Sequence, residues 1–252
     1  TSTDVAETST SAIDGADGDG FFITTFAMGG SSFSVGQDVE VDYADLDVGG
    51  VASDNTSQEL ATSASSWSEG DAKGVGFSFS TSMGSAAITV GHLMDNGPGG
   101  QQSNDINESG AVSASGVKVS LPIGPLSTTI GYHTDQTTST GVNATGVSAA
   151  YALPTGGTLS AAYQSSDSKA ANADAVRISA KYATSLGDGT AVSVGYTSTD
   201  QDTKATTTDL EVSVSRSIGT GASLFIDFHN RTGTTTANAG TSAVAVGTSV
   251  SF

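Results

Sequence analysis

The most constraining feature of this 252-residue sequence is a repeated alternation of apolar and small polar residues with a period of two. The final segment shows it most clearly, because Val244, Val246, Val250 and Phe252 share one parity while alanine, glycine and serine occupy the other. A period of two places the two sets on opposite faces of a β-strand. Each such segment lasts about ten residues, the length that a tilted strand needs to cross a lipid bilayer. The chain is therefore expected to be all-β.

Thirteen segments carry this pattern, and short and long connections alternate strictly between them. The short connections hold the residues that tight turns require, such as GG at residues 29–30 and GDG at residues 187–189. This order puts every tight turn at one end of the sheet, as in an up-and-down antiparallel meander and unlike a Greek-key sandwich. The predicted strands cover residues 20–29, 31–37, 73–82, 85–93, 112–121, 126–134, 144–153, 157–166, 175–185, 190–199, 208–218, 221–230 and 242–252.

A sheet that crosses a bilayer has to close into a barrel, because an unpaired edge would leave backbone N–H and C=O groups without partners in hydrocarbon. Bacterial single-chain barrels have an even number of strands, so thirteen is an incomplete count. Either one strand escapes the pattern, or strands that precede Thr1 are absent from the sequence. We favour the second interpretation. The sequence contains no run of 18 apolar residues, which is the pattern that would indicate a transmembrane helix.

Composition identifies which face is wet. The chain holds 39 serines, 34 threonines and 32 glycines, 13% of its residues are charged, and its net charge is −18. A face made of such small residues would not fill a packed core, but it suits the wall of a water-filled barrel. The alternative is a soluble sandwich or solenoid with a solvated polar face. The tyrosines are expected to form an interfacial belt on the apolar face: Tyr43, Tyr132, Tyr151, Tyr163, Tyr182 and Tyr196.

Several functional classes are disfavoured by what the sequence lacks. Its eight Lys and Arg residues are isolated, which argues against nucleic acid as a partner. Without cysteine there is no thiolate nucleophile and no usual zinc site. The three histidines lie in separate predicted strands, and no Gly-x-Ser-x-Gly turn is present. We therefore expect no enzymatic activity and no required cofactor.

Three stretches of sequence carry a resemblance to a known family. GDGFFI at residues 18–23 leads into GGSSFSVGQD at residues 29–38, VDYADLDVGG at residues 41–50 opens a long connection, and Phe252 ends the chain on the apolar parity. Together these features resemble the general-diffusion porins of Gram-negative outer membranes, most closely the sixteen-stranded trimeric porins of alphaproteobacteria.

The resemblance implies a single β-barrel domain over residues 1–252, with sixteen transmembrane strands of which about thirteen are in this sequence. It implies that residues 38–72 fold inward to narrow the pore, and that Phe252 is the signal for barrel assembly. It also implies a homotrimer in the outer membrane, in contact with lipid and lipopolysaccharide. The function implied is passive diffusion of small hydrophilic solutes and ions.

The connection at residues 38–72 is rich in carboxylates, which in a watery lumen would concentrate cations and slow anions. We therefore expect a cation preference; the alternative is that these acids only make a surface loop soluble. The resemblance implies that these acids face basic residues on the wall. It also makes calcium binding by the loop carboxylates plausible, since Ca²⁺ takes several oxygen ligands. The acids are Asp38, Glu40, Asp42, Asp45, Asp47, Asp54, Glu59, Glu69 and Asp71, and the basic candidates are Lys118, Arg177, Lys181 and Arg231.

Two other functions stay open at this point. A secreted or surface-layer structural or adhesive β-protein would share the acidic, cysteine-free composition rich in serine, threonine and glycine. A substrate-specific outer-membrane channel would be expected to carry a run of aromatic residues or a basic cluster, and the sequence has neither.

Overall fold

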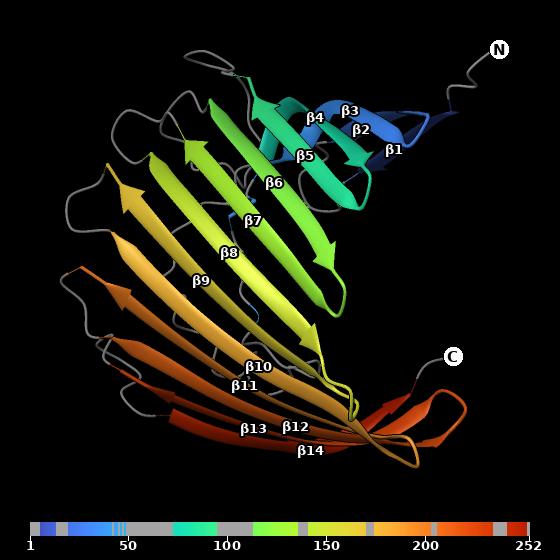
Figure 1. The fold of residues 1–252 in the computed structure, drawn as a ribbon, viewed down its shortest axis with the longest axis vertical. Coiled ribbons are helices and arrows are strands. Elements are labelled where there is room, and N and C mark those ends of the chain that lie inside the picture. Colours follow the sequence, from blue (N-terminus) through green and yellow to red (C-terminus); the bar gives the residue numbers. More distant parts are fainter. Residues whose placement is uncertain are drawn as a thin grey trace.

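The computed structural model describes residues 6–13, 20–41, 43–44, 46, 48, 73–94, 113–135, 141–169, 174–202, 206–233 and 241–250. Its strands form one antiparallel sheet in which each strand pairs with its neighbours in sequence, from β1 to β14. Figure 1 shows that this single sheet curves strongly between its blue and red edges. The strands are β1 (Ala6–Ile13), β2 (Gly20–Met28), β3 (Ser31–Glu40), β4 (Lys73–Met83), β5 (Ala86–Leu93), β6 (Ala114–Ile123), β7 (Leu126–Asp135), β8 (Val142–Ala152), β9 (Thr158–Ser168), β10 (Ala175–Gly187), β11 (Thr190–Gln201), β12 (Thr207–Gly219), β13 (Ala222–Thr232) and β14 (Thr241–Val250).

The two faces of the sheet differ as the alternation predicts. Five described residues that follow β3 lie against one face, and we call them the inner segment: Val41, Tyr43, Ala44, Leu46 and Val48. The face that they contact is called the inner face, and its buried side chains are mostly polar or small. The outer face carries exposed apolar side chains on nearly every strand. An amphipathic sheet of this kind exposes its apolar side to a non-aqueous environment.

The apolar band of the outer face has the height of a membrane. On β10 the exposed outer side chains run from Val176 through Ile178 and Tyr182 to Leu186. At about 3.3 Å per residue and a tilt of about 45°, this stretch spans roughly 25 Å, the height of the apolar band in outer-membrane barrels. None of the described residues belongs to a helix that is long and apolar enough to cross a membrane.

The tight turns have the backbone geometry that their residues predict. β2 and β3 are joined by Gly29 and Gly30, whose φ angles are 58° and 85°. A two-residue hairpin with two positive φ angles matches the right-handed twist of its strands and favours glycine at both positions. In the GDG turn, Asp188 has a φ of 47° and is the one non-glycine residue with positive φ in the described part of the chain. These turns lie at the end of the sheet opposite the long connections.

The structure confirms the thirteen predicted strands, with ends that shift by up to three residues, and it adds one strand, β1, that precedes them. β1 escapes the alternation because its sequence, AETSTSAI, has one large apolar residue, Ile13. The predicted end of the strand at residues 31–37 is wrong. β3 continues to Glu40, because the pairing resumes at Val39 after a register shift that follows Gly36. The sixteen-strand barrel stays a prediction, since the described order runs from β1 to β14 without a pairing between them.

Candidate functional site

The inner segment crosses the inner face on a row of glycines. Gly91 of β5 pairs with Gly116 of β6, and Gly131 of β7 pairs with Gly146 of β8. Glycine within a strand often marks a place where another backbone approaches closely. These four positions therefore identify the track that the inner segment follows.

The contact between the segment and the track leaves no room for side chains. A Cβ atom added to Gly131 would lie 1.7 Å from the carbonyl oxygen of Tyr43. On Gly116 it would lie 2.3 Å from the oxygen of Val41, and on Gly146 2.2 Å from the oxygen of Ala44. Real Cβ atoms do not approach within 3.0 Å, so the segment rests on the sheet backbone to backbone at these three strands.

Side chains of the inner face hold the segment by hydrogen bonds. The Nδ1 atom of His133 donates to the carbonyl oxygen of Val41 at 3.1 Å, and the Nε2 atom of Gln164 donates to that of Ala44 at 3.1 Å. The amide of Val48 donates to the Oγ atom of Ser179 at 3.1 Å. The donors and the acceptor belong to β7, β9 and β10, so the segment spans at least four neighbouring strands.

Apolar burial adds to this attachment. Val41 packs in a buried cluster with Val39, Leu93 and Ala114, and Ala44 packs with Val142 and Ala144. Tyr43 is buried on the inner face, so its predicted place in the interfacial belt is wrong. The other five tyrosines are exposed on the outer face as predicted. Tyr43 differs because it belongs to the inner segment, and strand parity does not apply there.

The predicted acids fall mostly outside the described residues. Asp38 and Glu40 lie in β3, where the prediction placed a loop, and their side chains lie outside the described part. Asp42, Asp45, Asp47, Asp54, Glu59, Glu69 and Asp71 lie outside the described residues, as does Phe252. The constriction and the calcium site therefore stay predictions. Within the described part of the chain, no group of three or more histidine, aspartate or glutamate side chains has an arrangement that could hold a metal ion.

The four basic candidates all lie on the inner face. The Nζ atom of Lys118 stands 5.3 Å from the ring centroid of Tyr43, within the range of a cation–π contact. Arg177 and Lys181 lie on β10, where Arg177 is buried. The Nε atom of Arg231 donates to Oδ1 of Asp209 at 2.6 Å. Lys118 and Arg231 thus each contact a partner residue inside the sheet.

A charged cluster on β12 and β13 was not expected from the sequence. The register pairs Asp209 with Arg231 and Glu211 with His229. The Nε2 atom of His229 lies 3.0 Å from Oδ1 of Asp209 and 3.9 Å from Oε1 of Glu211, and His229 is fully buried. The alternation of acids and bases on one parity of these strands is the signal that would have revealed it.

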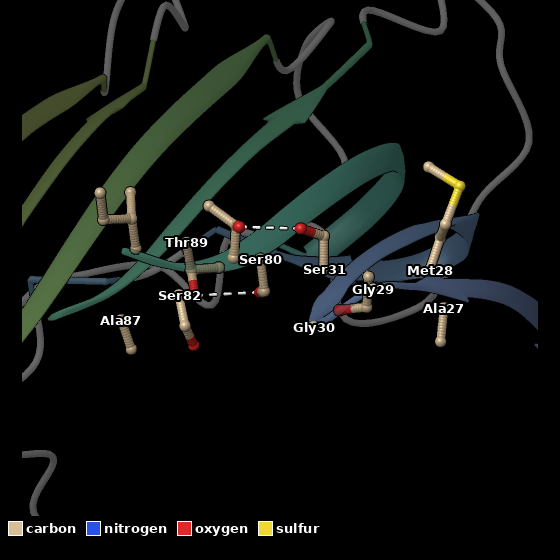
Figure 2. A pocket seen from close by; sticks show the side chains of 12 residues that line it. Ala27, Met28, Gly29, Gly30, Ser31, Ser80, Ser82, Ala87 and Thr89 are labelled. Carbon is tan, nitrogen blue, oxygen red and sulfur yellow. Dashed lines mark hydrogen bonds between the residues drawn. The ribbon is translucent and has the colours of Figure 1, made fainter. Parts of the chain in front are cut away.

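Serine and threonine side chains line the inner face near the tight turns of β2 to β7. Serine and threonine hydroxyls pair across neighbouring strands, with Thr25 and Ser34 at 2.8 Å and Ser120 and Thr129 at 3.0 Å. A pocket of about 420 Å³ lies beside the tight turns of β2 to β5. Figure 2 shows small side chains such as Ser80 and Ser82 along it, and its lining includes no charged residue. This region therefore offers an uncharged surface that water can wet.

The sequence of the chain matches a known protein family. A sequence model described as Gram-negative porin matches residues 8–250. The chain belongs to the Gram-negative porin family. This porin is therefore an outer-membrane protein, which excludes the secreted β-protein that its composition left open.

Solved structures agree with this fold. The anion-selective porin from Comamonas acidovorans is 16% identical, with a TM-score of 0.66 over 92% of this chain and 77% of that one. OmpT of Vibrio cholerae without its loop L8 is 13% identical, with a TM-score of 0.65 over 92% and 80%. A mutant of the Rh. blastica porin is 15% identical, with a TM-score of 0.57 over 94% and 80%. No curated protein matches the chain in sequence at a significant level.

Proposed function

We propose that this porin is a passive, water-filled channel for small hydrophilic solutes and ions, in which residues 38–72 narrow the pore. The observation that carries the proposal is the inner segment, whose residues rest on the inner face of the sheet over several strands. A chain that crosses the inside of a porin barrel reduces its open area, so solutes are sieved without any chemical step.

Truncating residues 44–70 tests this sieving role. The truncated porin is expected to show a higher single-channel conductance in planar bilayers than the full chain. Its assembly is checked by the heat-modifiable migration of its oligomer on a gel. An unchanged conductance in an assembled oligomer would remove the sieving role from this connection.

We propose a cation preference for the channel. The net charge of −18 and the nine acids of residues 38–72 support it, because fixed negative charges in a low-dielectric channel concentrate cations. The pairing of Arg231 with Asp209 supports it too, because it offsets one of the positive charges on the wall. The fold itself does not decide whether cations or anions are preferred, since the similar structure from Comamonas acidovorans is that of an anion-selective porin.

Reversal potentials under a KCl gradient measure this preference. We expect the potential to lie towards the K⁺ equilibrium value. A potential of zero, or one towards the Cl⁻ value, would contradict the charge argument and leave the passive channel intact.

We also propose that the porin is a homotrimer in contact with outer-membrane lipid and lipopolysaccharide. A trimer form of OmpT from Vibrio cholerae, with a TM-score of 0.55 to this chain, supports the oligomer. Native mass spectrometry in detergent is expected to give three copies of the chain, and a monomer would contradict the proposal.

A further inference from the structure

We infer that Gly116, Gly131 and Gly146, each with its register partner, are positioning residues that form a fixed seat for the inner segment. The inference rests on the proposed function, because the seated segment opens the connection that narrows the pore. It means that residues of the sheet, and not residues 38–72 themselves, determine where this connection lies.

Each glycine of the seat stands opposite a side chain that contacts the inner segment. Gly116 of β6 pairs with His133 of β7, which donates to the carbonyl of Val41. Gly146 of β8 pairs with Gln164 of β9, which donates to the carbonyl of Ala44. The glycine lets the segment's backbone approach, and the residue opposite it satisfies a carbonyl that the approach buries.

The third pair repeats the arrangement with an aromatic ring. Gly131 of β7 pairs with Lys118 of β6, whose ammonium group lies over the ring of Tyr43. The backbone of Tyr43 rests on Gly131, and its side chain extends over Gly116 and Gly91. A Cβ on Gly91 would lie 2.8 Å from the Tyr43 hydroxyl oxygen, so the row of glycines also makes room for this ring. Tyr43 is thus the side chain that anchors the segment.

The seat cannot adapt to a larger residue. An added Cβ at any of the three positions meets a carbonyl oxygen of the segment, and a backbone group does not rotate away as the end of a side chain would. Relief of the clash at Gly131 to an ordinary contact of 3.4 Å would move the Tyr43 carbonyl by about 1.7 Å. The 3.1 Å hydrogen bonds from His133 and Gln164 would not survive such a movement.

Cysteine labelling tests the seat directly, because the chain has no cysteine of its own. Ala44→Cys places one thiol at a fully buried position of the inner segment. A water-soluble maleimide should label it slowly in the detergent-solubilised oligomer. In the Gly131→Ala background labelling should be about tenfold faster or more, since reaction at a buried site follows the population of the open state.

Gly219→Ala is the matched control, because a Cβ there would meet nothing within 4 Å and the backbone φ is not positive. It should leave the labelling rate unchanged. If Gly131→Ala does not assemble, Tyr43→Ala, which alters no strand residue, should accelerate labelling instead. The seat would be overturned if Gly131→Ala, or Tyr43→Ala in its place, left the labelling rate of Ala44→Cys unchanged.

The conductance of Gly131→Ala separates this inference from the function on which it rests. Faster labelling together with altered conductance supports both. Faster labelling with unchanged conductance supports the seat and removes the sieving role from residues 38–72. Unchanged labelling overturns the seat whatever the conductance, and the truncation of residues 44–70 then decides the sieving role alone.

Discussion

Replacing Gln164 by leucine should loosen the inner segment without disturbing the sheet. Gln164 is fully buried, and its Nε2 atom donates to the carbonyl oxygen of Ala44 at 3.1 Å. Leucine has a similar volume but no donor, so this carbonyl would stay buried without the bond from residue 164. Leaving a buried acceptor unsatisfied costs about 1 to 3 kcal/mol. The equilibrium between seated and released segment should therefore shift by a factor of about 5 to 150 towards release.

Amide hydrogen exchange followed by mass spectrometry measures this shift. The peptide that covers residues 41–48 should exchange faster in Gln164→Leu by a factor within that range, because exchange reports the population of the open state. The amide of Val48, which donates to Ser179, is one protected group that release exposes.

Gln201→Leu provides the matched control for this experiment. Gln201 is also a buried glutamine of the inner face, on β11, and no bond from it to the inner segment is present among the described residues. Its replacement should leave exchange at residues 41–48 unchanged. Equal exchange in the two variants would show that the Gln164 bond does not hold the segment, and the reasoning from buried carbonyls would be refuted.

Two further predictions concern the wall. Arg231→Ala removes one of the partners of Asp209 and should move the reversal potential towards the K⁺ value, whereas Asp209→Asn should move it the other way. Shifts in the same direction would rule out a charge effect. On the outer face of β10, Ala180→Lys near the middle of the apolar band should lower the free energy of unfolding in lipid vesicles by about 2 to 4 kcal/mol. Val176→Lys, at the end of the band next to the long connections, should lower it by about 0 to 1 kcal/mol. Urea titration measures both values, and equal losses would contradict the assignment of the apolar band.

The strands of this porin could be predicted from the sequence because each carries its own signal. In β12, Leu210, Val212 and Val214 alternate with polar residues, and this pattern needs no knowledge of any other strand. β1 lacks such a signal, since threonine and serine fill both parities. The bulge that extends β3 to Glu40 depends on pairing with β4, so local sequence did not reveal it.

The seat could not be predicted in the same way, because it combines residues far apart in the chain. His133 lies 92 positions from Val41, and Gln164 lies 120 positions from Ala44. Their contacts depend on the register of β5 to β9, and register is a property of the whole sheet. The glycines inside the strands were the available signal of a close backbone approach, although they do not identify which segment of the chain approaches them.

The sequence by itself thus determined an all-β meander with one apolar and one polar face, because period-two alternation is a local property. Only the tertiary structure decided that Tyr43 turns inward, that Lys118 lies over its ring and that Arg231 pairs with Asp209. The physical reason is that these contacts join different strands or lie outside any strand, and their geometry exists only when the curved sheet is assembled.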